Sequence, residues 1–150
     1  MASHVGPLQA NSTLEKLADM CPTEKDEDLS LLVNILKQRG INFSRTGQLA
    51  KAVEQFEEAV GAVQLMEHPN QLALSQIYKF IADLQVQLGH LSKAQQALRE
   101  AEHLLKRVLA REDGDEVFRH SGLACIYTQL CMVAYRDRRA MEALELLGQA

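Results

Sequence analysis

The chain has 150 residues, 47% of them hydrophobic, which is enough for one domain with a continuous core. Aromatic residues make up only 5% and tryptophan is absent, whereas Ala, Leu, Gln, Glu and Lys are abundant, so the composition favours an all-helical fold. The net charge of −4, from 16 basic and 20 acidic residues, leaves no general basic footprint and argues against nucleic acid and anionic membranes as partners.

The sequence also indicates the compartment. No apolar run approaches the ~20 residues that cross a bilayer, and residues 1–17 lack the basic start and apolar centre of a signal peptide. Cys21, Cys125 and Cys131 form neither an even disulfide framework nor a CxxC zinc pair, so we expect them to be small buried hydrophobes in a reducing compartment. We therefore expect a soluble cytoplasmic protein, with the nucleus as the other candidate location.

Residues 1–22 are expected to form an N-terminal tail. The first ten residues carry no helical periodicity and are predicted to be disordered. Ser12 and Glu15 then fit a capping box, which predicts a short helix that stops at Pro22. The remaining residues, 23–150, are predicted to form a helical repeat domain.

Three pairs of helices are predicted in this domain. An acidic run at 23–28 would stabilise the start of the first helix, because acidic groups favour a helix N-terminus. Apolar periodicity, interrupted by turn-forming and charged segments, predicts the later boundaries. The predicted repeats span residues 27–66, 71–110 and 117–150, and the last contains one helix over 117–136 and another from Ala140 to the end.

One sequence pattern recurs at a fixed spacing. The stretch GQLAKAVEQFEEAV at 47–60 returns as GHLSKAQQALREAE at 89–102, with six identical residues that are each 42 positions apart. A constant spacing of this size is typical of a helical repeat array, in which each hairpin buries its apolar face against the next.

These residues resemble the tetratricopeptide repeat, a helix pair with small residues where the helices cross and larger ones between. The matching positions are Gly40, Phe43, Gly47, Leu49, Ala52, Phe56 and Ala59 in the first copy and Ala82, Gly89, Leu91, Ala94, Leu98 and Ala101 in the second. Gln85 replaces an aromatic residue in the second copy, and Arg138 replaces the turn glycine in the third. The spacing exceeds the family's unit of about 34 residues and is similar to the lengthened repeats of kinesin light chains and Leu-Gly-Asn-type adaptors. The resemblance implies a right-handed superhelix of about three antiparallel hairpins.

In tetratricopeptide arrays the first helix of each pair lines a concave groove, so the resemblance also implies a partner-binding surface. The corresponding positions are Asn34, Lys37, Gln38, Ile41, Ser44 and Arg45, then Gln76, Lys79, Phe80, Asp83, Val86 and Gln87, then Cys125, Thr128, Gln129, Met132, Tyr135 and Arg136. Lys37, Arg45, Lys79 and Arg136 outnumber the one acid, Asp83, in a chain that is acidic overall.

Phe80, Met132 and Tyr135 add apolar anchors, so these positions predict a protein or peptide partner with acidic residues and a large apolar side chain. Ordinary solvated cations around a partly buried Phe80 are the alternative interpretation. Only Lys37 matches the five-residue clamp with which one subfamily grips chaperone C-termini, so a chaperone-tail co-chaperone is disfavoured.

The sequence contains no motif that predicts catalysis or a cofactor. GxSxG, HExxH, GxxxxGK[ST] and glycine-rich phosphate loops are absent, and the five histidines are isolated. The acidic segment 111–116 lacks the alternating acids of a calcium loop. We therefore expect no enzyme activity, no cofactor and no metal.

The leading hypothesis is a non-catalytic adaptor with a preformed groove. The alternative is a structural subunit of a complex, covered at its apolar edges near Leu144, Leu146 and Leu147. Self-association through the C-terminal helix and membership of a longer repeat array also remain open.

Overall fold

The computed structural model describes residues 6–110 and 116–148, and these ranges contain α-helices without any strand. The helices are α1 (Pro7–Met20), α2 (Asp26–Arg45), α3 (Leu49–Gln64), α4 (Gln71–Gln87), α5 (Leu91–Ala110) and α6 (Glu116–Gly148). The expected all-helical class is confirmed. None of the described helices combines the length and apolarity that crossing a bilayer requires.

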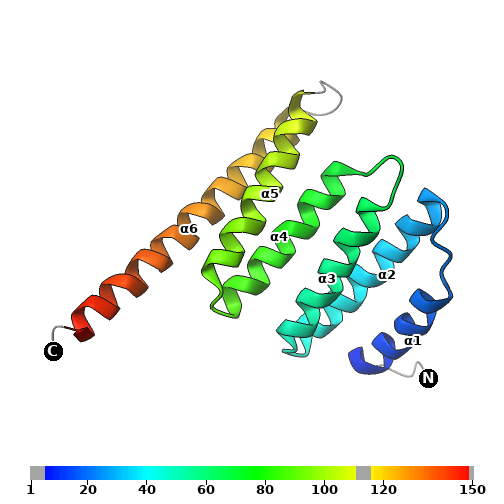
Figure 1. Ribbon diagram of the computed structural model, residues 1–150, viewed down its shortest axis with the longest axis horizontal. Helices are drawn as coiled ribbons and strands as arrows, with labels where there is room; N and C mark the ends of the chain where they lie inside the picture. Colours follow the sequence, from blue (N-terminus) through cyan, green and yellow to red (C-terminus); the bar gives the residue numbers. More distant parts are fainter. Residues whose placement is uncertain (1–5, 111–115, 149–150) are drawn as a thin grey trace.

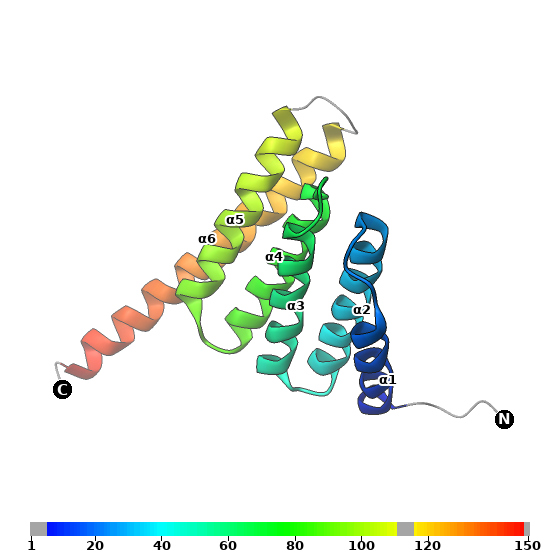
Figure 2. The ribbon, with the colours of Figure 1, turned by 45° about the vertical axis from the view of Figure 1, so that its right-hand side comes forward.

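The helices pack mainly in chain order. Each one lies against the next, and consecutive helices run in opposite directions, so that they succeed one another from α1 to α6 (Figures 1 and 2). One apolar cluster extends through this arrangement from Leu29 in α2 to Val133 in α6. The core is therefore continuous, although each helix contacts few others.

The two short turns of this arrangement have the same geometry. Gly47 and Gly89 have φ angles of 78° and 80°, in the left-handed region that glycine adopts without steric cost. The residue after each glycine closes the preceding helix: Gln48 N donates to Phe43 O at 2.9 Å, and His90 N donates to Gln85 O at 2.8 Å. The α2–α3 and α4–α5 hairpins thus end their first helices with the same C-terminal motif, 42 residues apart.

The ring of Phe56 links three helices. A Cβ atom on Gly40 of α2 would lie 2.7 Å from Phe56 Cε2, so only glycine leaves room for the ring. Phe56, in α3, is 1% exposed and stacks on Phe80 of α4, with ring centroids 5.2 Å apart and ring planes 2° from parallel. The first hairpin therefore fits onto the second through one aromatic side chain.

The N-terminal helix differs from the prediction. It begins at Pro7, where the fixed φ of proline suits the first helical position, so Ser12 lies inside the helix and caps nothing. Residues 7–10 are helical and not disordered, whereas residues 1–5 lie outside the described ranges. Buried amides hold α1 on α2: Asn42 Nδ2 donates to Asn11 Oδ1 at 3.1 Å, and Asn11 Nδ2 donates to the carbonyl oxygen of Arg39 at 3.4 Å.

The acidic start of α2 has a second role that the sequence pattern did not reveal. Asp26 lies in the first turn of α2, as predicted for this acidic run. Its two carboxylate oxygens also accept hydrogen bonds from Glu67 N at 2.9 Å and His68 N at 3.1 Å. The carboxylate therefore fixes the start of α2 to the connection between α3 and α4.

The predicted third hairpin is not present. Helix α6 is continuous over 33 residues and passes straight through the expected break between Arg136 and Ala140. Arg138 stands where the other two hairpins have a glycine. Its Nε lies 3.3 Å from Oε1 of Glu142, and this ion pair supports the helix across the expected break. The described architecture is two hairpins, α2–α3 and α4–α5, flanked by α1 and the long α6.

The cysteines are less buried than expected. Cys125 and Cys131 are exposed on α6, which contradicts the prediction of small buried hydrophobes at these two positions. Cys21 is partly buried, and its thiol donates to the carbonyl oxygen of Asp28 at 3.3 Å. All three are free thiols.

Gly40→Ala tests the fit of Phe56. Overpacking costs about 1–3 kcal/mol, and the better helix propensity of alanine returns about 1 kcal/mol, so we expect a net loss of about 0–2 kcal/mol in the free energy of unfolding. The measurement is urea unfolding followed by circular dichroism.

Gly61→Ala is the matched control, because Gly61 lies in α3 with nothing within 4 Å of an added Cβ atom. This variant should be stabilised by about 0.5–1 kcal/mol. Equal stability changes in the two variants would show that the ring does not restrict Gly40.

Candidate functional site

Two adjoining clefts lie along α2, α4 and α6. The first, about 300 Å³, is lined by Ile41, Ser44, Arg45, Phe56, Phe80, Asp83, Leu84 and Gln87. The second, about 310 Å³, is lined by Ala82, Asp83, Val86, Gln87, Leu98, Gln129, Met132, Val133 and Arg136. Asp83 and Gln87 of α4 belong to both clefts, so the two form one surface, which we call the α2–α4–α6 groove.

More than half of the positions predicted to line a groove are brought together here. They are Ile41, Ser44, Arg45, Phe80, Asp83, Val86, Gln87, Gln129, Met132 and Arg136. They come from the C-terminal halves of α2 and α4 and from the middle of α6.

The other predicted positions lie outside both clefts. They are Asn34, Lys37, Gln38, Gln76, Lys79, Cys125, Thr128 and Tyr135. Gln38 Nε2 donates to Asn42 Oδ1 at 3.1 Å, and the ring of Tyr135 lies 5.7 Å from the guanidinium carbon of Arg139. The positive lining of the groove is therefore two guanidinium groups, and not the four cations that the sequence suggested.

The groove has an apolar part in a fixed position. Phe80 is 41% exposed, and its ring is held by the stack on Phe56 beneath it. Met132 of α6 is also exposed and lines the second cleft. Together these side chains offer apolar surface to a ligand without any rearrangement of the core.

The centre of the groove is acidic. Gln129 Nε2 of α6 donates to Asp83 Oδ1 of α4 at 3.2 Å, which joins the two helices across the second cleft. The side chain of Asp83 is exposed as a whole, but its carboxyl is partly desolvated at the wall shared by both clefts. This burial raises the pKa of Asp83, and the nearby Lys79 ammonium partly opposes the shift.

The two ends of the groove are basic. Arg45 lines the first cleft and Arg136 lines the second, and both side chains are exposed. Within the described parts of the chain, neither guanidinium pairs with a carboxylate. Both groups are thus available to an anionic ligand.

The buried floor of the groove was not predicted as part of a site. Phe56 and Leu98 were expected only as positions of the repeat pattern, and Leu84 and Val133 were not singled out, yet all four also line the clefts. Their spacing could not separate the two roles, because a core residue at the bottom of a cleft has the same apolar pattern as one that is fully covered.

A larger cleft of about 820 Å³ lies along α3, α4 and α5. It includes two acids and two bases, Glu57, Glu100, Lys93 and Arg99, and burial together with the Glu100 carboxylate raises the pKa of Tyr78 in its wall. This mixed charge gives no preference for one kind of ligand. In the part of the chain that the structure describes, no three His, Cys, Asp or Glu side chains are grouped to hold a metal ion.

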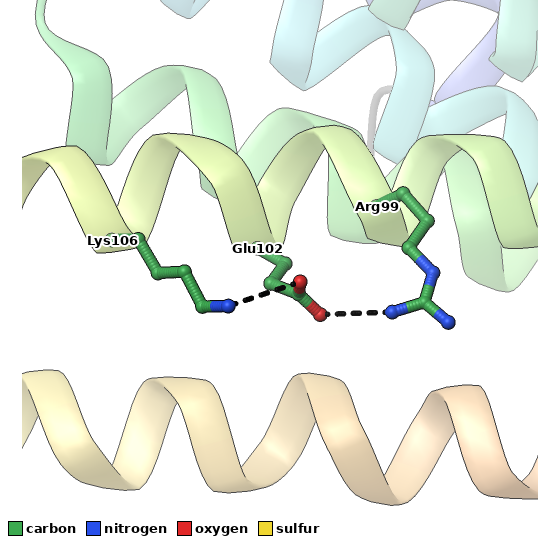
Figure 3. Close-up of polar contacts among 3 residues, drawn as sticks. All are labelled: Arg99, Glu102 and Lys106. Atoms are coloured by element: carbon green, nitrogen blue, oxygen red, sulfur yellow. Dashed lines mark hydrogen bonds and ion pairs between the residues drawn. The ribbon is translucent and has the colours of Figure 1, made fainter.

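A polar cluster on α5 is structural. Glu102 accepts from Arg99 at 3.2 Å and from Lys106 at 3.4 Å, and these side chains lie on the side of α5 that faces α6 (Figure 3). Hydrogen bonds to the Tyr127 hydroxyl of α6 and to Glu102 raise the pKa of Lys106. The two ion pairs join side chains one turn apart within α5 and support that helix.

Asp83→Asn is expected to stabilise the protein at about pH 7 and to leave it unchanged at about pH 3. Burial raises the folded-state pKa of Asp83 above its unfolded value, so its contribution to stability is greatest below the unfolded pKa and falls as pH rises through the folded pKa. The asparagine oxygen can still accept from Gln129. The measurement is urea unfolding across this pH range.

Asp19→Asn, which removes an exposed carboxylate from α1, controls for the general change in net charge. If Asp83→Asn were less stable than the wild type at neutral pH, ionised Asp83 would be favoured in the fold and our interpretation of its environment would be wrong.

No family model, curated protein or solved structure matches the chain. The functional conclusion therefore depends on the groove and its chemistry.

Proposed function

We propose that the chain is a non-catalytic adaptor that binds a partner peptide in the α2–α4–α6 groove. The observation that carries this proposal is the junction of two clefts at Asp83 and Gln87, with an apolar floor and an exposed arginine at each end. A preformed groove of this kind binds without ordering its own backbone, which lowers the entropic cost of association.

The architecture that we propose for this adaptor is a lengthened tetratricopeptide-type array in a right-handed superhelix. Three observations support it: the matching turns at Gly47 and Gly89, the close approach of Gly40 to Phe56, and the packing of each helix on its chain neighbour. In this scheme α1 and α6 flank two complete repeats. Free cysteine thiols agree with a reducing compartment, and we propose the cytoplasm.

The charges of the groove define the ligand. An acidic residue near each end of the peptide would pair with Arg45 and Arg136, because guanidinium groups bind carboxylates with charge-assisted hydrogen bonds. A large apolar residue would cover Phe80 and Met132. The middle of the peptide would avoid a carboxylate and present a hydrogen-bond donor to Asp83.

A displayed peptide library supplies the test. Peptides selected on the wild type are measured by fluorescence anisotropy against Arg45→Glu/Arg136→Glu, for which we expect at least about a tenfold loss of affinity. The matched control, Lys16→Glu/Lys25→Glu, has the same change in net charge at exposed positions outside both clefts, and we expect less than about a twofold change.

Equal losses in the two double variants would attribute binding to net charge and overturn the proposed site. Selected peptides without acidic residues, or a library that returns no ligand, would contradict the proposed ligand chemistry.

A further inference from the structure

Three polar side chains form a row across the α2–α4–α6 groove, and we call them the donor row. Arg45 is the last residue of α2, Gln87 is the last residue of α4, and Gln129 lies in α6, each 42 residues from the next. Arg45 and Gln87 line the first cleft, and Gln87 and Gln129 line the second. The repeat spacing therefore places one hydrogen-bonding side chain on each helix of the groove, in the order of the helices.

The first two members of the donor row leave the backbone at equivalent points. Gly47 and Gly89 each follow a row residue by two positions, and their φ angles of 78° and 80° end α2 and α4 with the same turn. Arg45 and Gln87 are thus presented from corresponding places on their two helices. A ligand that contacts the whole row has to pass from helix to helix and cannot follow a single one.

The donor row changes its chemistry along the groove. Arg45 carries a guanidinium group, which suits a carboxylate. Gln87 and Gln129 carry amides, each with a carbonyl acceptor and an NH₂ donor. A peptide group also has one acceptor and one donor. A glutamine amide can therefore bind the main chain of a ligand at both kinds of atom, whatever side chains the ligand has.

Both amides have hydrogen-bonding capacity left for a ligand. Gln87 is exposed, and its side chain takes part in no hydrogen bond within the described ranges. Gln129 Nε2 donates to Asp83 Oδ1 at 3.2 Å, but Gln129 Oε1 is buried and has no partner among the described residues. Because a buried acceptor without a donor is unfavourable, the Gln129 amide gains a hydrogen bond when it turns toward a ligand N–H.

An extended ligand, and not a helical one, can use these amides. In an α-helix the interior N–H and C=O groups bond to one another. An extended segment keeps its main-chain groups free for the protein that binds it. Asp83 lies one turn before Gln87 and lines both clefts, so its carboxylate adds an acceptor for a further N–H of such a segment.

We propose that the α2–α4–α6 groove binds an extended peptide segment whose main chain is held by Gln87 and Gln129. This inference rests on the proposed function, because it assigns the conformation and the main-chain contacts of the same peptide ligand. Arg45 binds an acidic side chain at one end, and the two amides hold the residues that follow without selecting their side chains. The sequence requirements of the ligand are then confined to the residues that meet the two arginines and the exposed apolar side chains of the groove.

An amide-to-ester scan of a peptide selected on the wild type tests this assignment by fluorescence anisotropy. Each ester removes one N–H of the peptide and leaves every side chain in place. We expect at least one ester to weaken binding to the wild type at least about fivefold. The same ester should cost less than about twofold in Gln87→Leu/Gln129→Leu, because the acceptor for that N–H is already absent. Gln76→Leu is the matched control, since Gln76 is an exposed glutamine of α4 outside both clefts, and it should leave the ester costs unchanged.

Equal ester costs in the wild type and in Gln87→Leu/Gln129→Leu would overturn the main-chain contacts. Nuclear Overhauser contacts of a helix within the peptide bound to the wild type would also overturn the inference. If either result accompanies the expected loss of affinity in Arg45→Glu/Arg136→Glu, the groove remains the binding site and only the assigned ligand conformation is wrong. A library that returns no ligand would overturn the proposed function and this inference together.

Discussion

The fit of one aromatic ring connects the first hairpin with the second. Phe56 is buried against the bare backbone of Gly40 on one helix and stacked on Phe80 on another, so the separation of α2 from α4 is set by the thickness of a side chain. Closely packed cores resist such a change in volume. The same stack leaves one part of Phe80 exposed in the groove. Stability and the proposed binding surface thus depend on the same contact.

The difference between the two hairpins and α6 comes from single residues at helix ends. Gly47 and Gly89 take up a backbone conformation that a residue with a Cβ atom adopts only at a steric cost, and the chain reverses there. Arg138 occupies the corresponding place in α6, and the neighbouring sequence is rich in residues that favour helices, so the helix continues. The middle of the long α6 then lines the second cleft of the groove beside α4.

Local sequence patterns predicted α2 to α5 because helical periodicity, acidic first turns and turn glycines act over only a few residues. They failed where a contact joins residues that are far apart in the sequence, and where a second local pattern indicated the wrong start of a helix. Asp26 binds an amide 42 residues away, which no local pattern reveals, and Pro7 starts α1 earlier than the weak capping box at Ser12 suggested.

For the groove, the repeat pattern pointed to positions on α2, α4 and α6, but it could not show that residues 41–45 and 80–87 line one surface while Lys37 and Gln76 lie outside the clefts. That distinction depends on how the helices converge, which is a property of tertiary packing.

The proposed function requires that ligands bind along α2, α4 and α6 and not in the larger cleft along α3, α4 and α5. The most direct measurement is NMR chemical-shift mapping of the protein during titration with a peptide selected on the wild type. We expect the largest changes at Ile41, Phe80 and Met132, which line the groove. Changes centred instead on Glu57, Lys93 and Glu100 would place the ligand in the larger cleft and overturn the proposed binding site.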